Sequence, residues 1–287
     1  MFSPPPSKTA PASGILAALV CMVATSVALA QQQAAPPNFS DGFAVGWMAV
    51  GGGAGGFTPV AGRVPPLSTD PAHPYAANNN SEGRQPTPRI ADISNPNLKP
   101  WAKEVMRKDI AEILAGRKMA FTPRSSCMPT GVPSFMAYGG GGFATFFLQT
   151  PREVWMIFQG EQEVRRIYLD VPHSTAPKPS WYGESVGHYE GDTLVVDTIG
   201  QNNKTFVDPF RTPHSQKLHV VERWRMVDNN QALEATVTVE DPDTYYQPWT
   251  GLRRYRRVQQ EYIEHICAEN NQQLVDWHIP VADTPDF

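Results

Sequence analysis

The sequence predicts a mainly β protein: an antiparallel up-and-down β-barrel of about eight strands, preceded by one N-terminal helix. From about residue 142 onward, apolar residues recur at every second position, which is the period of a half-buried strand. Short turns separate most of these segments, as in an antiparallel meander. The expected strands are 143–149, 153–159, 163–170, 184–190, 193–199, 218–227, 232–241 and 250–258.

About eight strands suffice to close a barrel whose interior holds packed side chains or one small ligand, as in lipocalin-like (calycin) folds. A β-sandwich is the alternative, because the strand count and the turn spacing fit both architectures. No Gly-rich turn is followed by alternating helices and strands, which argues against a dinucleotide-binding α/β domain.

The N-terminal region divides into a targeting segment and an arm. Residues 1–30 carry Lys8, then an apolar stretch, and end in Ala28-Leu29-Ala30, as a secretory signal peptide does. We therefore expect an exported protein, periplasmic or secreted, with no membrane segment once the signal is removed. Residues 31–95 are rich in Gln, Ala, Pro, Gly and Asn and predict a mostly irregular arm.

One helix is expected within residues 96–118, packed on a barrel domain of residues 119–268, with residues 269–287 as a C-terminal tail. Pro100 suits a first helical position and Gly116 suits a C-terminal stop. The apolar residues near helical spacing are Trp101, Val105, Ile110, Ile113 and Leu114.

Cys127 and Cys267 remain once the signal peptide is removed. Two thiols in an oxidising compartment usually pair, so we predict a disulfide, with two buried free thiols as the alternative. The net charge of −4 offers no basic surface for nucleic acid. The Arg-rich stretch 253–257 does not change this expectation, because alternation along a strand divides its arginines between two faces.

The first hairpin is expected to turn at Glu190-Gly191, which pairs Tyr189 with Asp192. One face of the hairpin would then carry Glu184, Val186, His188, Thr193, Val195 and Asp197. The second hairpin is expected to turn at Asn229-Asn230.

This second turn pairs His219 with Glu240 and Arg225 with Glu234, which we interpret as exposed ion pairs of little energetic weight. Glu222 falls on the apolar face of the same hairpin, where a carboxylate needs a partner or a proton. Arg254 and Arg256 are the expected partners.

The tripeptide Pro-His-Ser occurs twice, at residues 172–174 and 213–215. One outgoing and one returning strand lie between the copies, so strand parity places His173 and His214 at one rim. The predicted catalytic residues are His173, His214, Glu184, Asp197 and Glu222. The predicted substrate-binding residues are Trp181, Tyr182, His188, Lys204, Tyr245, Tyr246 and Trp249.

These residue types favour proton-transfer chemistry. A histidine beside a carboxylate can act as a general base or acid near neutral pH, and Lys or Tyr donors can stabilise an oxyanion. We therefore expect a cofactor-free enzyme of the lyase, isomerase or decarboxylase type, acting on a small aromatic or apolar molecule. The alternatives are a non-catalytic lipocalin-like carrier and a cell-envelope interaction module, whose barrel interior would be filled. Two histidines and a carboxylate can also hold zinc, although no His-Glu-x-x-His or Cys-x-x-Cys motif supports a metal.

Several longer motifs between residues 165 and 251 belong together. They are Arg166-Ile-Tyr168, Pro172-His173, the run Gly187-His-Tyr-Glu-Gly-Asp-Thr-Leu-Val-Val-Asp-Thr198, Lys204-Thr205, Pro213-His-Ser215, Glu222-Arg223, Glu240-Asp-Pro242 and Pro248-Trp-Thr250. On these motifs the chain resembles a family of exported bacterial β-rich proteins of unassigned function. The family usually carries Trp in place of Tyr189 and Gly-Arg-Pro-His in place of residues 170–173. The resemblance implies membership but no reaction.

Overall fold

Nine strands close into a barrel, and one short strand pairs outside it. The computed structural model describes residues 3, 35–42, 44–51, 53–137, 143–160 and 163–267. The strands are β1 Gly46–Val50, β2 Thr58–Pro59, β3 Thr145–Gln149, β4 Glu153–Phe158, β5 Glu163–Leu169, β6 Glu184–Glu190, β7 Thr193–Ile199, β8 His219–Val227, β9 Ala232–Glu240 and β10 Trp249–Val258. They are hydrogen-bonded in the order β1-β3-β4-β5-β6-β7-β8-β9-β10, and pairing of β1 with β10 closes the barrel. The predicted signal peptide and C-terminal tail lie outside the described residues, except for residue 3.

The predicted barrel is confirmed, with two differences of detail. First, the segment predicted as an irregular arm supplies β1 and β2, and β1 is the strand that closes the barrel. Second, β5 and β6 run parallel, with Ile167 opposite Ser185. A parallel pair needs a long crossover, and residues 170–183 provide it along the outside of the barrel.

Gly187 lets β6 approach β5 closely. A Cβ atom on Gly187 would lie 3.1 Å from Ile167 Cγ2 and 2.8 Å from the carbonyl oxygen of Val195. A larger side chain there would push β6 away from both of its neighbours.

The barrel interior is filled with side chains. Alternation along each strand points one apolar set inward, as the period of two requires. Fully buried members of this set include Phe147, Val154, Ile167, Leu194, Val196, Trp224, Leu233 and Val237. Ring contacts such as Phe147 with Trp224, at 5.7 Å between centroids, join opposite walls of the interior.

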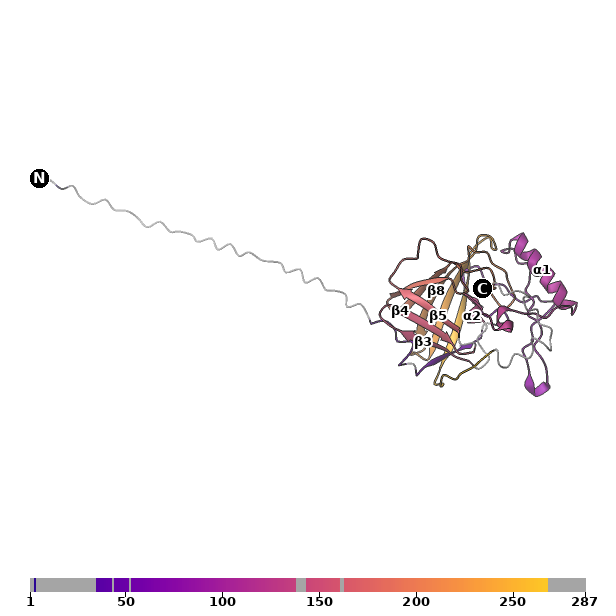
Figure 1. Ribbon diagram of the computed structural model, residues 1–287, viewed down its shortest axis with the longest axis horizontal. Helices are drawn as coiled ribbons and strands as arrows, with labels where there is room; N and C mark the ends of the chain where they lie inside the picture. Colours follow the sequence, from indigo (N-terminus) through magenta and orange to yellow (C-terminus); the bar gives the residue numbers. More distant parts are fainter. Residues whose placement is uncertain are drawn as a thin grey trace. The chain divides into compact units, whose positions relative to one another are not determined.

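Helix α1, Pro100–Leu114, begins and ends near the predicted positions, but its buried face differs from the predicted one. The buried side chains are Ala102, Met106 and Ile113, whereas Trp101 and Val105 are 39% and 45% exposed. Contacts with the loop after β9 fix this orientation, since the Lys99 amide donates to the Thr244 carbonyl at 2.9 Å. Figure 1 shows α1 to one side of the barrel strands. The remaining helices are single turns: η1 Asn80–Glu82, η2 Pro123–Ser126 and α2 Ser134–Ala137.

Cys127 and Cys267 form the predicted disulfide, with their Cα atoms 5.7 Å apart. The bond joins the turn that ends η2 to the end of the described chain.

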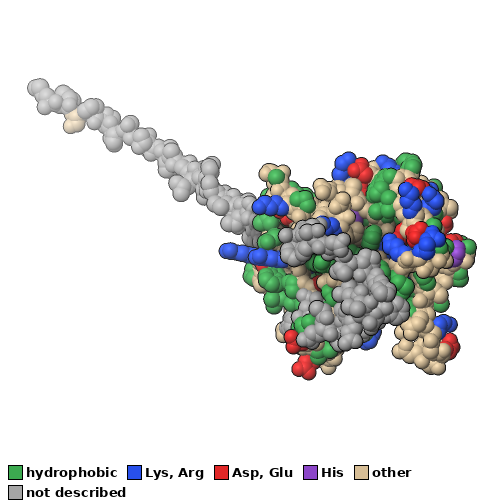
Figure 2. All heavy atoms as spheres, turned by 45° about the vertical axis from the view of Figure 1, so that its right-hand side comes forward, with side chains coloured by type: hydrophobic (Ala, Val, Ile, Leu, Met, Phe, Trp, Pro, Cys, Tyr) green, Lys and Arg blue, Asp and Glu red, His purple; other side chains and the backbone are tan. Residues whose placement is uncertain are grey.

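Charged side chains are mixed on the surface that Figure 2 shows, where basic and acidic groups are interspersed over the coloured part of the molecule. This arrangement agrees with the net charge of −4. Within the described part of the chain, no helix is both long and apolar enough to cross a membrane.

Candidate functional site

Three of the predicted catalytic residues, His173, Glu184 and Asp197, meet on the outer face of the barrel. The crossover 170–183 carries His173 over β6 and β7. There His173 Nδ1 lies 3.0 Å from Glu184 Oε1, and its Nε2 lies 3.0 Å from Asp197 Oδ1. The backbone amide of Ser174 also donates to Glu184 Oε1, at 2.7 Å.

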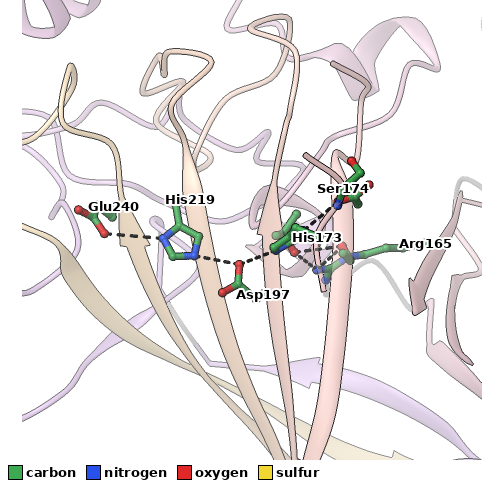
Figure 3. A network of polar contacts seen from close by, with 9 residues as sticks. Arg165, His173, Ser174, Asp197, His219 and Glu240 are labelled. Carbon is green, nitrogen blue, oxygen red and sulfur yellow. Dashed lines mark hydrogen bonds and ion pairs between the residues drawn. The ribbon is translucent and has the colours of Figure 1, made fainter. Parts of the chain in front are cut away.

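This contact chain continues over the next two strands (Figure 3). His219 on β8 places Nε2 2.9 Å from the same Asp197 Oδ1, and its Nδ1 lies 3.7 Å from Glu240 Oε2 on β9. Glu184, His173, Asp197, His219 and Glu240 thus form an alternating set of carboxylates and imidazoles, which we call the carboxylate–imidazole row. All five side chains are partly exposed, from 22% for His173 to 54% for Glu240.

Shared hydrogen bonds shift the acid–base equilibria of the row. The bond to Asp197 raises the pKa of His219, and this effect outweighs the burial that would lower it. Burial would raise the pKa of Asp197, but hydrogen bonds from His219 and His173 overcome it and lower that pKa. Burial likewise opposes the lowered pKa of Glu184, where the bonds from Ser174 and His173 prevail. Within the row, the raised pKa favours protonation of His219.

A small cleft of about 280 Å³ lies at the rim of the barrel; none of the five row residues lines it, but sequence and strand neighbours of the row do. Ile199, which pairs with Glu184, forms part of its wall, as does Leu218, which directly precedes His219. We call it the proline cleft; its lining residues are Pro177, Pro179, Ile199, Gly200, Gln201, Gln216, Lys217 and Leu218. Gln201 is fully buried, and its Nε2 has no hydrogen-bond partner among the described residues. The cleft therefore has largely apolar walls, and the Gln201 amide in its lining is buried.

His214 does not join the row. It is only 4% exposed and lies within the loop after β7, where Nε2 contacts Thr205 Oγ1 at 2.8 Å and Nδ1 contacts the Ser215 carbonyl at 2.9 Å. Burial lowers the pKa of His214, so its neutral form is favoured. The two Pro-His-Ser copies thus place their imidazoles in different environments, one on the outer face and one in the packed loop layer.

Glu222 lies inside the barrel and pairs with Arg165, not with Arg254 or Arg256. Arg165 Nη1 lies 2.8 Å from Glu222 Oε1 and 2.9 Å from Oε2, and Trp224 Nε1 donates to Oε2 at 2.8 Å. Arg165 also donates to Thr198 Oγ1 at 2.7 Å, and both charged side chains are at most 1% exposed. This environment is that of a structural ion pair without access for a substrate.

The run Gly183-Glu-Ser-Val-Gly187 matches the Gly-x-Ser-x-Gly pattern of a nucleophile elbow. An elbow requires a sharp turn from strand to helix, whereas Ser185 lies within β6. Ser185 Oγ accepts from Arg165 at 3.1 Å inside the barrel, and Ser185 is 2% exposed. The pattern is therefore not a nucleophile elbow.

The predicted substrate-binding residues occupy separate environments. Tyr245 and Trp249 are buried together, with ring centroids 6.5 Å apart, while Tyr246 is 62% exposed. His188 sits on the outer face near the opposite end of β6 and pairs with Glu190 at 3.1 Å. Trp181 and Tyr182 are half-buried at the end of the crossover, and Lys204 lies in an exposed turn after β7.

The observed strand pairing explains which residues of the carboxylate–imidazole row could be predicted from the sequence. The first hairpin is shifted from the predicted register, because Glu190 pairs with Thr193. The shift preserves which residues face outward, so Glu184 and Asp197 remain on one face. The second hairpin has the predicted register, with His219 opposite Glu240. The sequence thus located His219 correctly but gave no reason to connect it to Asp197, because β7 and β8 are joined by a long loop.

Among the described residues, no group of three His, Cys, Asp or Glu side chains has the geometry to hold a metal ion. Comparison with family models, curated proteins and solved structures found no match to this chain.

Proposed function

We propose that the protein is an exported enzyme that abstracts a proton from a small, mainly apolar carbonyl compound, as isomerases and lyases do. The observation that carries this proposal is the carboxylate–imidazole row beside the proline cleft. Two imidazoles share one carboxylate oxygen there, at 3.0 and 2.9 Å, next to apolar walls.

The row supplies the base. His219 in its neutral form accepts the proton, and Asp197 stabilises the imidazolium that results. His173 is held by Glu184 and keeps Asp197 in place. A base whose pKa is raised toward neutral pH by such a neighbour is suited to general catalysis.

Gln201 supplies the polarising donor. The Nε2 of Gln201 is buried without a partner among the described residues, so the side chain would turn toward the cleft to donate to the developing negative charge of a bound carbonyl group. An N–H donor placed on a developing oxyanion typically contributes about 10²–10³ in rate. Pro177, Pro179 and Ile199 would hold the apolar part of the molecule.

A lipocalin-type carrier is less well supported, because such a carrier holds its ligand in the barrel interior and this interior is packed with Trp224, Phe147 and the Arg165–Glu222 pair. A filled interior also agrees with an interaction module. That function, however, does not explain why the carboxylate–imidazole row lies near the proline cleft.

Hydrogen–deuterium exchange tests the proposal. A panel of small ketones and aromatic carbonyl compounds is incubated with the protein in D2O, and deuterium uptake at the α-carbon is followed by NMR. We expect His219→Gln to slow exchange about 10²–10⁴-fold, the usual contribution of a general base. His188→Gln is the matched control, because His188 also pairs with a glutamate on the outer face. It lies about 13 Å from Glu184 along β6. The proposal is wrong if no compound that binds the cleft exchanges faster than in buffer, or if both variants behave alike.

The pH dependence gives a second readout. The base acts in its deprotonated form, so exchange should rise with pH through the pKa of His219, which lies above its ordinary 6.5. Asp197→Asn removes the cause of that raised pKa and should move the midpoint to lower pH. An unchanged midpoint in this variant would contradict the role of His219.

A further inference from the structure

A second hollow, of about 540 Å³, lies between the arm, the end of α1 and the segment that follows it. Its volume is within the range of small-molecule sites. It shares no lining residue with the proline cleft. We call it the arginine pocket, after Arg89 and Arg211 in its wall.

Arg211 is held inside the protein in an unusual conformation. It is 4% exposed, and its φ of +64° lies in the left-handed region, which a non-glycine residue adopts only when its surroundings impose it. Its Nε donates to Asp109 Oδ2 at 2.7 Å, and its Nη1 donates to the Arg89 carbonyl at 3.4 Å. Its Nη2 is buried without an acceptor among the described residues. A buried charged donor is normally hydrogen-bonded, so this group calls for a partner.

Arg89 presents a second unused donor. Its Nη2 donates to Tyr75 Oη at 3.2 Å, and its guanidinium lies 4.6 Å from the centre of the Tyr75 ring. Its Nε is buried and has no acceptor among the described residues. Two guanidinium groups in the wall of one pocket therefore each have an unpartnered N–H.

The charge balance of the pocket is positive. Arg89, Arg211 and Lys118 line it, and none of its lining residues is acidic. The carboxylates that interact with these cations are Asp109, which binds Arg211 and Lys118, Asp208, which interacts with Arg211, and Glu112, which interacts with Lys118. Glu112 in turn forms an ion pair with Arg117. Four positive groups against three negative groups leave one cation in excess, which a monoanion would neutralise.

The rest of the wall is largely apolar, with Ile113, Met119 and Phe121 among its members. We propose that the arginine pocket binds a small organic anion such as an aromatic carboxylate. Its carboxylate would accept from the unpartnered N–H groups of Arg211 and Arg89, and its apolar body would lie against Met119 and Phe121. This proposal does not depend on the proposed enzymatic activity, because the two sites share no residue.

Isothermal titration calorimetry with three probes tests the ligand class. Benzoate should bind, and its affinity should fall as salt is added, because the attraction is partly electrostatic. Benzamide, which has the same shape without the charge, should bind at least tenfold more weakly. Inorganic phosphate should also bind at least tenfold more weakly, because it lacks an apolar body. Equal affinity for benzoate and benzamide, or for benzoate and phosphate, would overturn the proposal, as would absence of benzoate binding.

Substitutions place the binding in the arginine pocket. Arg211→Gln should weaken benzoate binding at least tenfold. Arg211 also binds Asp109, so its substitution could disturb folding. A second variant therefore changes an exposed position. Met119 is 47% exposed, and Met119→Asp adds a negative charge to the pocket wall at little cost to folding. Met119→Asp should weaken benzoate binding at least tenfold, whereas the control Met128→Asp, 43% exposed and outside the pocket wall, should not. Unchanged binding in Met119→Asp would show that the anion binds elsewhere.

Discussion

At the scale of single residues, the Arg165–Glu222 pair shows how a buried charge can be structural. Each partner neutralises the other, and Trp224, Thr198 and Ser185 satisfy most of their remaining hydrogen bonds. Because both groups are removed from water, either charge without its partner would strongly destabilise the folded protein.

We expect Glu222→Leu to destabilise the protein by about 3–5 kcal/mol, because it leaves the Arg165 guanidinium buried without a counter-ion. The double variant Arg165→Met/Glu222→Leu should be more stable than the single variant. Urea denaturation measures both free energies of unfolding. The exposed pair Arg107–Glu104 provides the control, since solvent screens it and Glu104→Gln should leave the free energy of unfolding nearly unchanged. A double variant less stable than Glu222→Leu would contradict this account.

The sequence placed several residues of the row on the correct strand face, because strand alternation is a local property. Glu184 and Asp197 were placed on one face, and His219 was placed opposite Glu240. The partner of Glu222 could not be found in this way. Arg165 lies on β5, which is separated from β8 by two strands of the barrel wall, so only closure of the barrel brings the two charges together.

At the scale of elements, β1 shows how composition can hide a strand. The run Gly46-Trp-Met-Ala-Val50 is short and is followed by a Gly-rich stretch, so its alternation is weak. It becomes a strand because it fits between β3 and β10, where Trp47 and Ala49 point into the interior. A gap left by its absence would expose two strand edges.

Gly46 is the residue that lets β1 fit against β3. A Cβ atom on Gly46 would lie 2.7 Å from the Cβ of Ala144 and 3.2 Å from the Phe146 ring, so Gly46→Val forces the strands apart. We expect a loss of about 1–3 kcal/mol, as for overpacked interiors. Thermal denaturation compares this variant with Thr58→Val, an exposed position on β2 outside the barrel, which should change stability by about 0.5 kcal/mol or less. Equal effects of the two substitutions would show that the β1–β3 contact is not tightly packed.

At the scale of the whole molecule, the disulfide connects chain segments that are 140 residues apart in sequence. The closed loop contains all the strands from β3 to β10. A long covalent loop stabilises mainly by restricting the unfolded chain.

The double variant Cys127→Ser/Cys267→Ser should therefore lower the free energy of unfolding by about 4–5 kcal/mol. Urea denaturation of the oxidised protein and of the variant gives this difference. A reducing agent should destabilise the natural protein by a similar amount and leave the variant unchanged. If the variant unfolds at the same urea concentration as the oxidised protein, the bond makes no contribution.

The sequence by itself determined the eight main strands, the helix, the disulfide and the shared face of Glu184 and Asp197. All of these follow from local alternation, capping residues, or the pairing of two thiols. The tertiary structure alone decided that β5 and β6 run parallel, that β1 closes the barrel, and that His219 and His173 share Asp197. It also decided that His214 is buried away from this row and that Glu222 pairs with Arg165. Those features depend on which segments become neighbours when the sheet closes on itself, and a periodic pattern in one segment carries no information about its distant neighbours.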